Sequence, residues 1–142
     1  MILMPHCPMN SGLARHETFA GHAFIWWDVE HVRLSPRALA LCQDPNNQLV
    51  LSVASVWEME VKIQLGKLRF EKPLAEMISE QQRANNIEIL PVTLPHALAL
   101  ETLPPIHKDP FDRLLIAQAK VEGIPFISRD AEFAAYPIVL EW

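Results

Sequence analysis

The stretch that decides the fold is residues 109–130, which read DPFDRLLIAQAKVEGIPFISRD. Asp109 is a favourable N-cap with a proline after it, and apolar residues then recur at helical spacing until Gly123, a typical helix end. Residues 124–128 follow as a short apolar segment, which favours a strand. The stretch therefore predicts a helix, then a strand, then an acidic residue, Asp130.

The same alternation runs along the rest of the chain from residue 35. The segment 48–55 is apolar without a polar alternation, as expected for a strand buried on both faces of a parallel sheet. The predicted helices are 35–42, 55–65, 73–85, 94–103 and 109–123, and the other predicted strands are 87–91, 124–128 and 138–140. Alternating strands and helices predict an α/β fold in which helices cover both faces of a parallel sheet.

Length and composition indicate one globular domain. The chain has 142 residues, of which 50% are hydrophobic and 20% are charged. The first apolar run stops after four residues, so neither a signal peptide nor a membrane anchor is expected. We expect residues 20–142 to form the domain and residues 1–19 to be an atypical N-terminal segment.

The net charge and the cysteines indicate which kinds of protein and which kinds of site are expected. A formal net charge of −5 argues against a protein that coats nucleic acid, although an enzyme needs only a local site. Cys7 and Cys42 are far apart and predict two free thiols in a reducing cytoplasm. His6, Cys7, His16 and His22 match no zinc-site spacing.

Four acids lie directly after predicted strands or at the start of predicted helices: Glu58, Asp109, Asp112 and Asp130. Right-handed crossovers place these positions on the same edge of a parallel sheet. A cluster of carboxylates without cysteine or histidine suits Mg²⁺ or Mn²⁺. Such ions favour hydrolysis of a phosphodiester.

Each acid also has a simpler interpretation as part of a helix cap. Ser55 and Glu58 have the spacing of a capping box, and Asp109 and Asp112 suit the first turn of a helix. Asp130 is placed to cap the short segment 131–135. Only convergence at one edge would distinguish a site from three separate caps.

Other side chains near these acids are open to two interpretations. Lys62, Lys108, Arg113 and Arg129 could bind phosphates, but solvated ion pairs are the more common role. The tryptophans at 26, 27 and 57 could stack on bases, but we expect them in the core. An exposed apolar patch that included them would instead indicate a protein partner.

Several segments together resemble the PIN domains of VapC-like toxins, and the likeness runs from about residue 20 to the end. The order and spacing of the segments are specific, whereas no single segment is. The segments are 22–27 (HAFIWW), 34–36 (LSP), 52–58 (SVASVWE), 62–68 (KIQLGKL), 90–93 (LPVT), 109–119 (DPFDRLLIAQA) and 128–130 (SRD).

This resemblance implies a three-layer α/β/α sandwich and a metal-dependent endoribonuclease that cuts RNA. It implies Glu58, Asp112 and Asp130 as catalytic residues that bind Mg²⁺ or Mn²⁺, with Asp109 as a further metal ligand. It also implies a cognate antitoxin that covers the site, and a homodimer.

One acid of the family pattern has no counterpart. The family's first strand ends in an aspartate, and counting back from segment 22–27 places it at position 20, where this chain has Ala20. The preceding residues 13–19 are a poor match to a buried strand, and Glu17 is three positions away. We therefore expect a degraded first strand and an impaired or inactive nuclease site.

Three hypotheses follow from these patterns. The first is a VapC-like ribonuclease, and the second is a catalytically silent PIN module that binds an antitoxin or RNA without cutting it. The third is another α/β protein with an acidic cluster, such as a receiver domain or a phosphatase. A receiver domain needs a lysine late in the chain, and the late lysine here, Lys120, falls inside a predicted helix.

Overall fold

The protein is an α/β domain, seen here in a computed structural model that describes residues 16–18, 24 and 33–142. Its helices are α2 (Pro36–Gln43), α3 (Val53–Gln64), α4 (Leu74–Asn85), α5 (Leu94–Leu98) and α6 (Pro110–Glu122), with the 3-10 helices η2 (Ala99–Thr102) and η3 (Ala131–Ala135). Its strands are β1 (His16–Thr18), β2 (Gln48–Ser52), β3 (Glu88–Leu90), β4 (Phe126–Ile127) and β5 (Leu140–Glu141).

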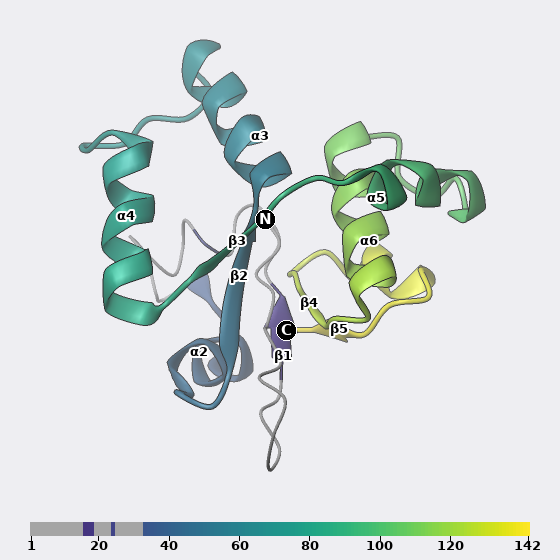
Figure 1. Cartoon of the computed structure of the whole chain (residues 1–142), viewed down its shortest axis with the longest axis horizontal. Coiled ribbons are helices and arrows are strands. Elements are labelled where there is room, and N and C mark those ends of the chain that lie inside the picture. The colour runs from purple at the N-terminus through teal and green to yellow at the C-terminus, as the bar shows by residue number, and fades with distance from the viewer. Residues whose placement is uncertain (1–15, 19–23, 25–32) are drawn as a thin grey trace.

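All strand pairs in the described part of the chain are parallel. Strands β1, β2 and β3 form one sheet with β2 in the middle, and β4 pairs with β5. The two sheets adjoin where β1 contacts β4. Figure 1 shows α4 on one side of the strands and α5 and α6 on the other. The predicted α/β/α sandwich with a parallel sheet is therefore confirmed.

Strand β2 is buried on both faces, as its apolar sequence predicts. Leu49, Val50 and Leu51 are each at most 2% exposed and lie in the hydrophobic core. The strand is shorter than predicted, because Ser52 caps the next helix by accepting a hydrogen bond from the Ala54 amide at 3.0 Å. Helix α3 therefore begins at residue 53 rather than 55.

Strand β1 forms although its sequence is a poor match to a buried strand. His16, Glu17 and Thr18 pair in parallel register with Gln48, Leu49 and Val50 of β2. Strand pairing uses backbone N–H and C=O groups, which every one of these residues supplies whatever its side chain. The first strand is thus short but present, and it lies between β2 and β4.

The helix ends follow the residues that predicted them. Ser35 caps α2 through a 3.0 Å bond from the Ala38 amide. Helix α6 ends at Gly123, which has φ +71°, and α4 ends at Asn86, which has φ +52°. Both residue types tolerate this left-handed conformation.

The structure tests the predictions made for one cysteine, Cys42, and one tryptophan, Trp57. Cys42 is a buried thiol on α2, whereas Cys7 lies outside the described residues. Trp57 is 65% exposed on α3, so the prediction that it packs in the core is wrong, and Trp26 and Trp27 lie outside the described residues. Trp57 is exposed because the face of α3 that packs on the core carries Ala54, Ser55, Glu58 and Met59 instead.

Among the described residues, no helix is both long and apolar enough to cross a membrane.

The role of Ser52 can be tested against Ser35, since both cap a helix. Ser52 is fully buried and also donates its hydroxyl to Gln118 Oε1 of α6. Ser35→Ala should lose only a cap, about 1 kcal/mol. Ser52→Ala should cost about 2–4 kcal/mol, because it also leaves a buried amide oxygen without its donor. Urea unfolding of the two variants measures the difference, and equal losses would contradict the link to Gln118.

Candidate functional site

The predicted acids lie where chain segments leave or approach one edge of the sheet. Glu58 is on α3, which follows β2 directly, and Asp130 comes three residues after the end of β4. Asp109 and Asp112 lie at the N-terminus of α6, the helix that runs back along the strands towards β4. In a parallel α/β fold, helices begin at the carboxyl edge of the sheet.

Glu58 is largely buried and paired with a lysine. It is 8% exposed, and its Oε1 lies 2.8 Å from Lys62 Nζ one turn later on α3. The predicted capping box is wrong, because Ser52 and not Ser55 is the N-cap of this helix. The ordinary interpretation of Lys62 as an ion-pair partner is confirmed.

The hydroxyl of Ser55 does not cap α3, contrary to the prediction. Ser55 is 1% exposed on α3, three residues before Glu58 and on the same side of the helix. Its Oγ has no hydrogen-bond partner among the described residues. A buried hydroxyl without a partner costs free energy, so the residue is explained neither by capping nor by packing.

Asp109 is the N-cap of α6, as predicted. Its Oδ1 accepts hydrogen bonds from the amides of Phe111 at 2.8 Å and Asp112 at 3.3 Å. These bonds account for one carboxylate oxygen and hold the acid beside Asp112.

Asp112 carries the clearest electrostatic perturbation in the described part of the chain. Its pKa is raised from 3.8 to about 6, first by burial and then by the nearby negative charges of Asp109 and Glu58. A positive charge on His107 acts in the opposite direction. Three predicted acids, one from α3 and two from α6, are therefore close enough to repel one another.

Asp130 is held by consecutive turns after β4. Its amide donates to Ser128 Oγ at 3.1 Å, and its own Oδ1 accepts from the Glu132 amide at 2.9 Å. The predicted cap of segment 131–135 is confirmed. The second oxygen, Oδ2, lies 3.2 Å from His107 Nε2.

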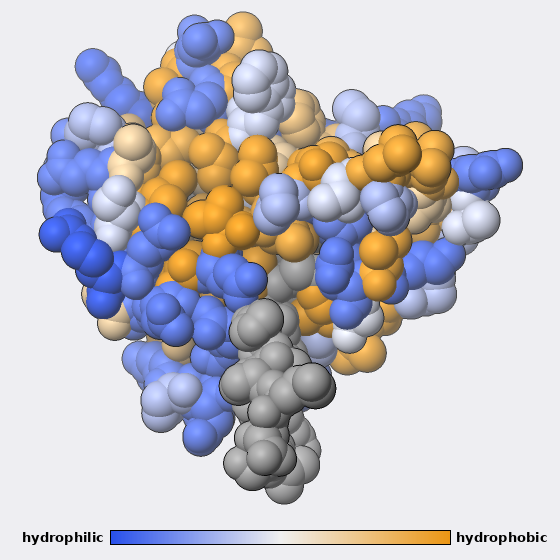
Figure 2. All heavy atoms as spheres, viewed as in Figure 1, coloured by the Kyte–Doolittle hydropathy of each residue, from blue (hydrophilic) through white to orange (hydrophobic). Residues whose placement is uncertain are grey.

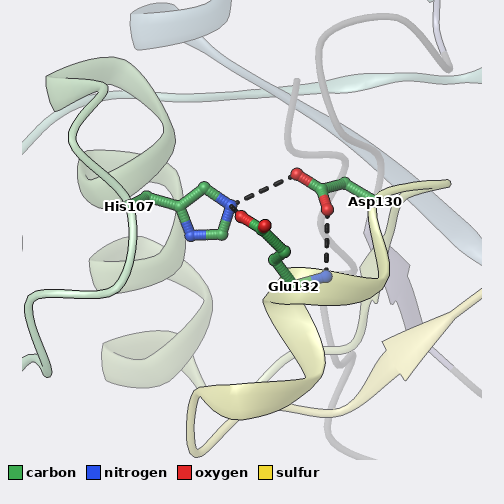
Figure 3. Close-up of side chains that lie close together, drawn as sticks. All are labelled: His107, Asp130 and Glu132. Carbon is green, nitrogen blue, oxygen red and sulfur yellow. Dashed lines mark hydrogen bonds and ion pairs between the residues drawn. The ribbon is translucent and has the colours of Figure 1, made fainter.

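His107 and Glu132 complete a second group of side chains around Asp130 (Figure 3). Glu132 Oε2 lies 3.7 Å from His107 Nε2. Within residues 16–18, 24 and 33–142, these three side chains are the only group of three histidine, cysteine or acidic residues whose ligand atoms all lie within 4.8 Å. The acids thus form two neighbouring groups, with His107 acting on Asp112 and bonded to Asp130.

Sequence reasoning missed His107 and Glu132. Both lie two positions from an acid that was singled out, His107 before Asp109 and Glu132 after Asp130. A histidine in the loop before the DPFD segment was the available signal. Glu132 offered none, because an acid in the first turn of a short helix is ordinary.

Of the other basic residues near the acids, Arg113 has a structural contact. Arg113 donates from Nη2 to the Leu103 carbonyl at 3.4 Å, and its buried Nε has no partner among the described residues. Lys108 and Arg129 are exposed.

An α/β/α sandwich with acids from α3, α6 and the end of β4 is the class of domain that this geometry defines. Residues 22–139 match the family described as "PIN domain". The match covers most of the chain, so this protein belongs to the PIN domain family. No curated protein matches the chain.

A solved structure supports the fold independently. It is described as the crystal structure of VapBC2 from Rickettsia felis bound to a DNA fragment from their promoter. The superposition has a TM-score of 0.64 at 13% identity and covers 87% of this chain and 95% of that one. The predicted PIN domain family is thus confirmed by the family match, and the predicted fold by this structure.

The crowding of the acids predicts how stability depends on pH in the metal-free protein. Since the pKa of Asp112 is higher in the folded chain, at about 6, than its ordinary value of 3.8, the folded state binds this proton more tightly. Its contribution to stability therefore falls as pH rises from about 4 to 6 and stays low above that range. Asp112→Asn, which mimics the protonated acid, should raise the free energy of unfolding at pH 7.5 by about 1 kcal/mol after allowance for solvent exposure.

Urea unfolding at pH 7.5 and pH 4.5 measures this effect. At pH 4.5 the same substitution should change little, because Asp112 is already protonated there. Glu71→Gln, at an exposed acid outside the cluster, is the matched control and should show no such dependence. An equal gain for Asp112→Asn at both pH values would contradict the raised pKa.

Proposed function

We propose that this protein is a VapC-like toxin, a metal-dependent endoribonuclease that hydrolyses RNA phosphodiesters. Glu58, Asp112 and Asp130 are its proposed catalytic metal ligands, and Asp109 is a further ligand. The observation that carries the proposal is the raised pKa of Asp112, about 6, which is due first to burial and then to the nearby charges of Asp109 and Glu58. Membership of the PIN domain family supports it.

The donor set fits a hard divalent cation. Glu58, Asp109 and Asp112 offer only carboxylate oxygens, which suit Mg²⁺ or Mn²⁺. A cation would stabilise acids that repel one another in the folded chain, and such repulsion is part of the reason why the pKa of Asp112 is raised. When bound, the cation would supply positive charge to the scissile phosphate and acidify a water for attack.

The chain's own residues set the conditions for this chemistry. The N-cap bonds of Asp109 hold its carboxylate beside Asp112, and burial keeps Glu58 away from bulk water. Lys62 offsets the charge of Glu58 at 2.8 Å. Asp130 would have to turn from His107 to join the other acids, since its Oδ2 now lies 3.2 Å from Nε2 of that histidine.

The alternative is a catalytically silent PIN module, and Ala20 is the observation that favours it. The position where the family pattern has an aspartate holds an alanine, which cannot bind a cation. Position 20 lies outside the described residues. Glu17 is a poor substitute, because its backbone pairs with Leu49, three residues and about 10 Å before the end of β2.

We also propose a cognate antitoxin and a homodimer, with the cytoplasm as the location. The similar Rickettsia felis structure is a complex named VapBC2, which supports a partner of that kind. Exposed apolar side chains support partners as well: Trp57 on α3 is 65% exposed, and Leu94 and Leu98 on α5 are 70% and 62% exposed. Figure 2 shows hydrophobic surface over α5 and between α3 and α4.

The function is tested by incubating the purified chain with a pool of folded RNAs, in Mg²⁺ or Mn²⁺ and in a chelator. We expect cleavage that requires the cation. Glu58→Gln and Asp112→Asn should each lower the cleavage rate by about 100-fold or more, because each loses a charged ligand. Glu60→Gln is the matched control, since this exposed acid is two residues from Glu58 on the same helix, and its rate should stay unchanged.

Two other results would redirect the proposal. A folded chain that binds RNA and does not cut it would support the silent module, and Ala20→Asp should then restore cleavage. Cleavage that survives both Glu58→Gln and Asp112→Asn would contradict the assigned site.

A further inference from the structure

A second group of side chains, formed by His107, Asp130 and Glu132, lies next to the proposed ribonuclease site. We propose that these three residues form a separate binding site for a divalent first-row transition cation, of the class of Mn²⁺, Co²⁺ or Zn²⁺. The site differs from the all-carboxylate group in having an imidazole ligand, and it shares only Asp130 with it. The proposal does not depend on ribonuclease activity.

The imidazole of His107 is fixed before any cation arrives. Its side chain is 8% exposed and stacks on Phe133, with ring centroids 4.5 Å apart and an interplanar angle of 15°. The ring of Tyr136 also stacks on His107, with ring centroids 5.4 Å apart. The stacking leaves Nε2 as the ring nitrogen that faces the two carboxylates (Figure 3).

Tyr136 also lets Nε2 change between donor and ligand. Its hydroxyl accepts a hydrogen bond from the His107 amide at 2.8 Å and lies 3.2 Å from His107 Nδ1. A tyrosine hydroxyl both donates and accepts, so it can bond either to a bare Nδ1 or to a protonated one. In the second case Nε2 is left with a lone pair, as a metal ligand requires, without loss of the Tyr136 contact.

The distances from His107 Nε2 to the two carboxylate oxygens are close to those expected around one cation, and all three ligand atoms lie within 4.8 Å of one another. Two atoms that each lie about 2.1 Å from a metal are about 3.0–3.4 Å apart at octahedral or tetrahedral angles. Asp130 Oδ2 lies 3.2 Å from Nε2, inside this range, and Glu132 Oε2 lies 3.7 Å from it. The Glu132 side chain is 72% exposed and can close the remaining few tenths of an ångström by rotation.

Charge and ligand type indicate the class of cation. Two carboxylates supply two negative charges, which match a dication. An imidazole with carboxylates suits Mn²⁺, Co²⁺ and Zn²⁺ better than Mg²⁺, which prefers oxygen ligands. Because Asp130 and Glu132 are 46% and 72% exposed, the remaining coordination positions would face solvent.

The test is a titration of the metal-free full-length protein with Co²⁺, read from its visible absorption, and with Zn²⁺, read by calorimetry. We expect binding that Mg²⁺ does not displace. Glu132→Gln should weaken it by about 10-fold or more, and His107→Asn by about 100-fold, since each removes one of three protein ligands. The matched control is Glu101→Gln, at an exposed acid in the other short helix, η2, and it should bind as the unmodified chain does.

The variants separate this site from the ribonuclease site. Because His107 is buried, circular dichroism must show that the His107→Asn variant is folded. If that variant does not fold, the Glu132→Gln variant provides the test, since the Glu132 side chain is exposed. Co²⁺ and Zn²⁺ binding that is unchanged in Glu132→Gln but lost in Glu58→Gln would overturn the proposal and leave the ribonuclease intact. Binding that depends on Glu132 in a chain without cleavage would support this site and count against the ribonuclease.

Discussion

The side chain of Ser52 joins the elements on which the position of the acids depends. It ends β2, caps α3 through the Ala54 amide, and donates its hydroxyl to Gln118 in the middle of α6. One buried hydroxyl therefore fixes where α3 starts and holds α6 against it. Since Glu58 lies on α3 and Asp112 on α6, the distance between their charges follows from this contact and from the packing of the two helices.

The acids placed in this way work against stability in the metal-free chain. Burial and two like charges raise the pKa of Asp112 to about 6, so the ionised site is costly at neutral pH. Lys62 offsets part of the charge on Glu58, and His107 does so near Asp112. Helix capping alone gives no reason to place Glu58, which is buried, close to Asp109 and Asp112, because an exposed cap serves equally well.

The sequence predicted those features that local chemistry determines. Asp109, Gly123 and Ser35 act at helix ends as their residue types predict. The start of α3 was missed because Ser52 and Ser55 are equally good caps in isolation, and only the buried contact with Gln118 distinguishes them. The exposure of Trp57 was also missed, because the sequence alone did not show which face of α3 packs on the core.

The candidate site was harder to predict, since its geometry depends on long-range contacts. The approach of Glu58 to Asp112 could be expected from the topology of a parallel sheet. The contact of His107 with Asp130 could not be expected from the topology, because it requires the loop before α6 to pack on Phe133 and Tyr136. The pairing of β1 with β2 likewise joins segments that are far apart in the sequence.

Asp130 belongs to both of the proposed cation sites. Its Oδ1 caps η3 and its Oδ2 bonds to His107, yet a carboxylate has about four lone pairs and can bind a cation while it caps. Turning towards Glu58 and Asp112 would give up the bond to His107, which is worth only about 0.5–1.5 kcal/mol. That cost is small beside the binding of a dication by several carboxylates. Under the two proposals, the bound cation, rather than the fold, would therefore decide which group Asp130 joins.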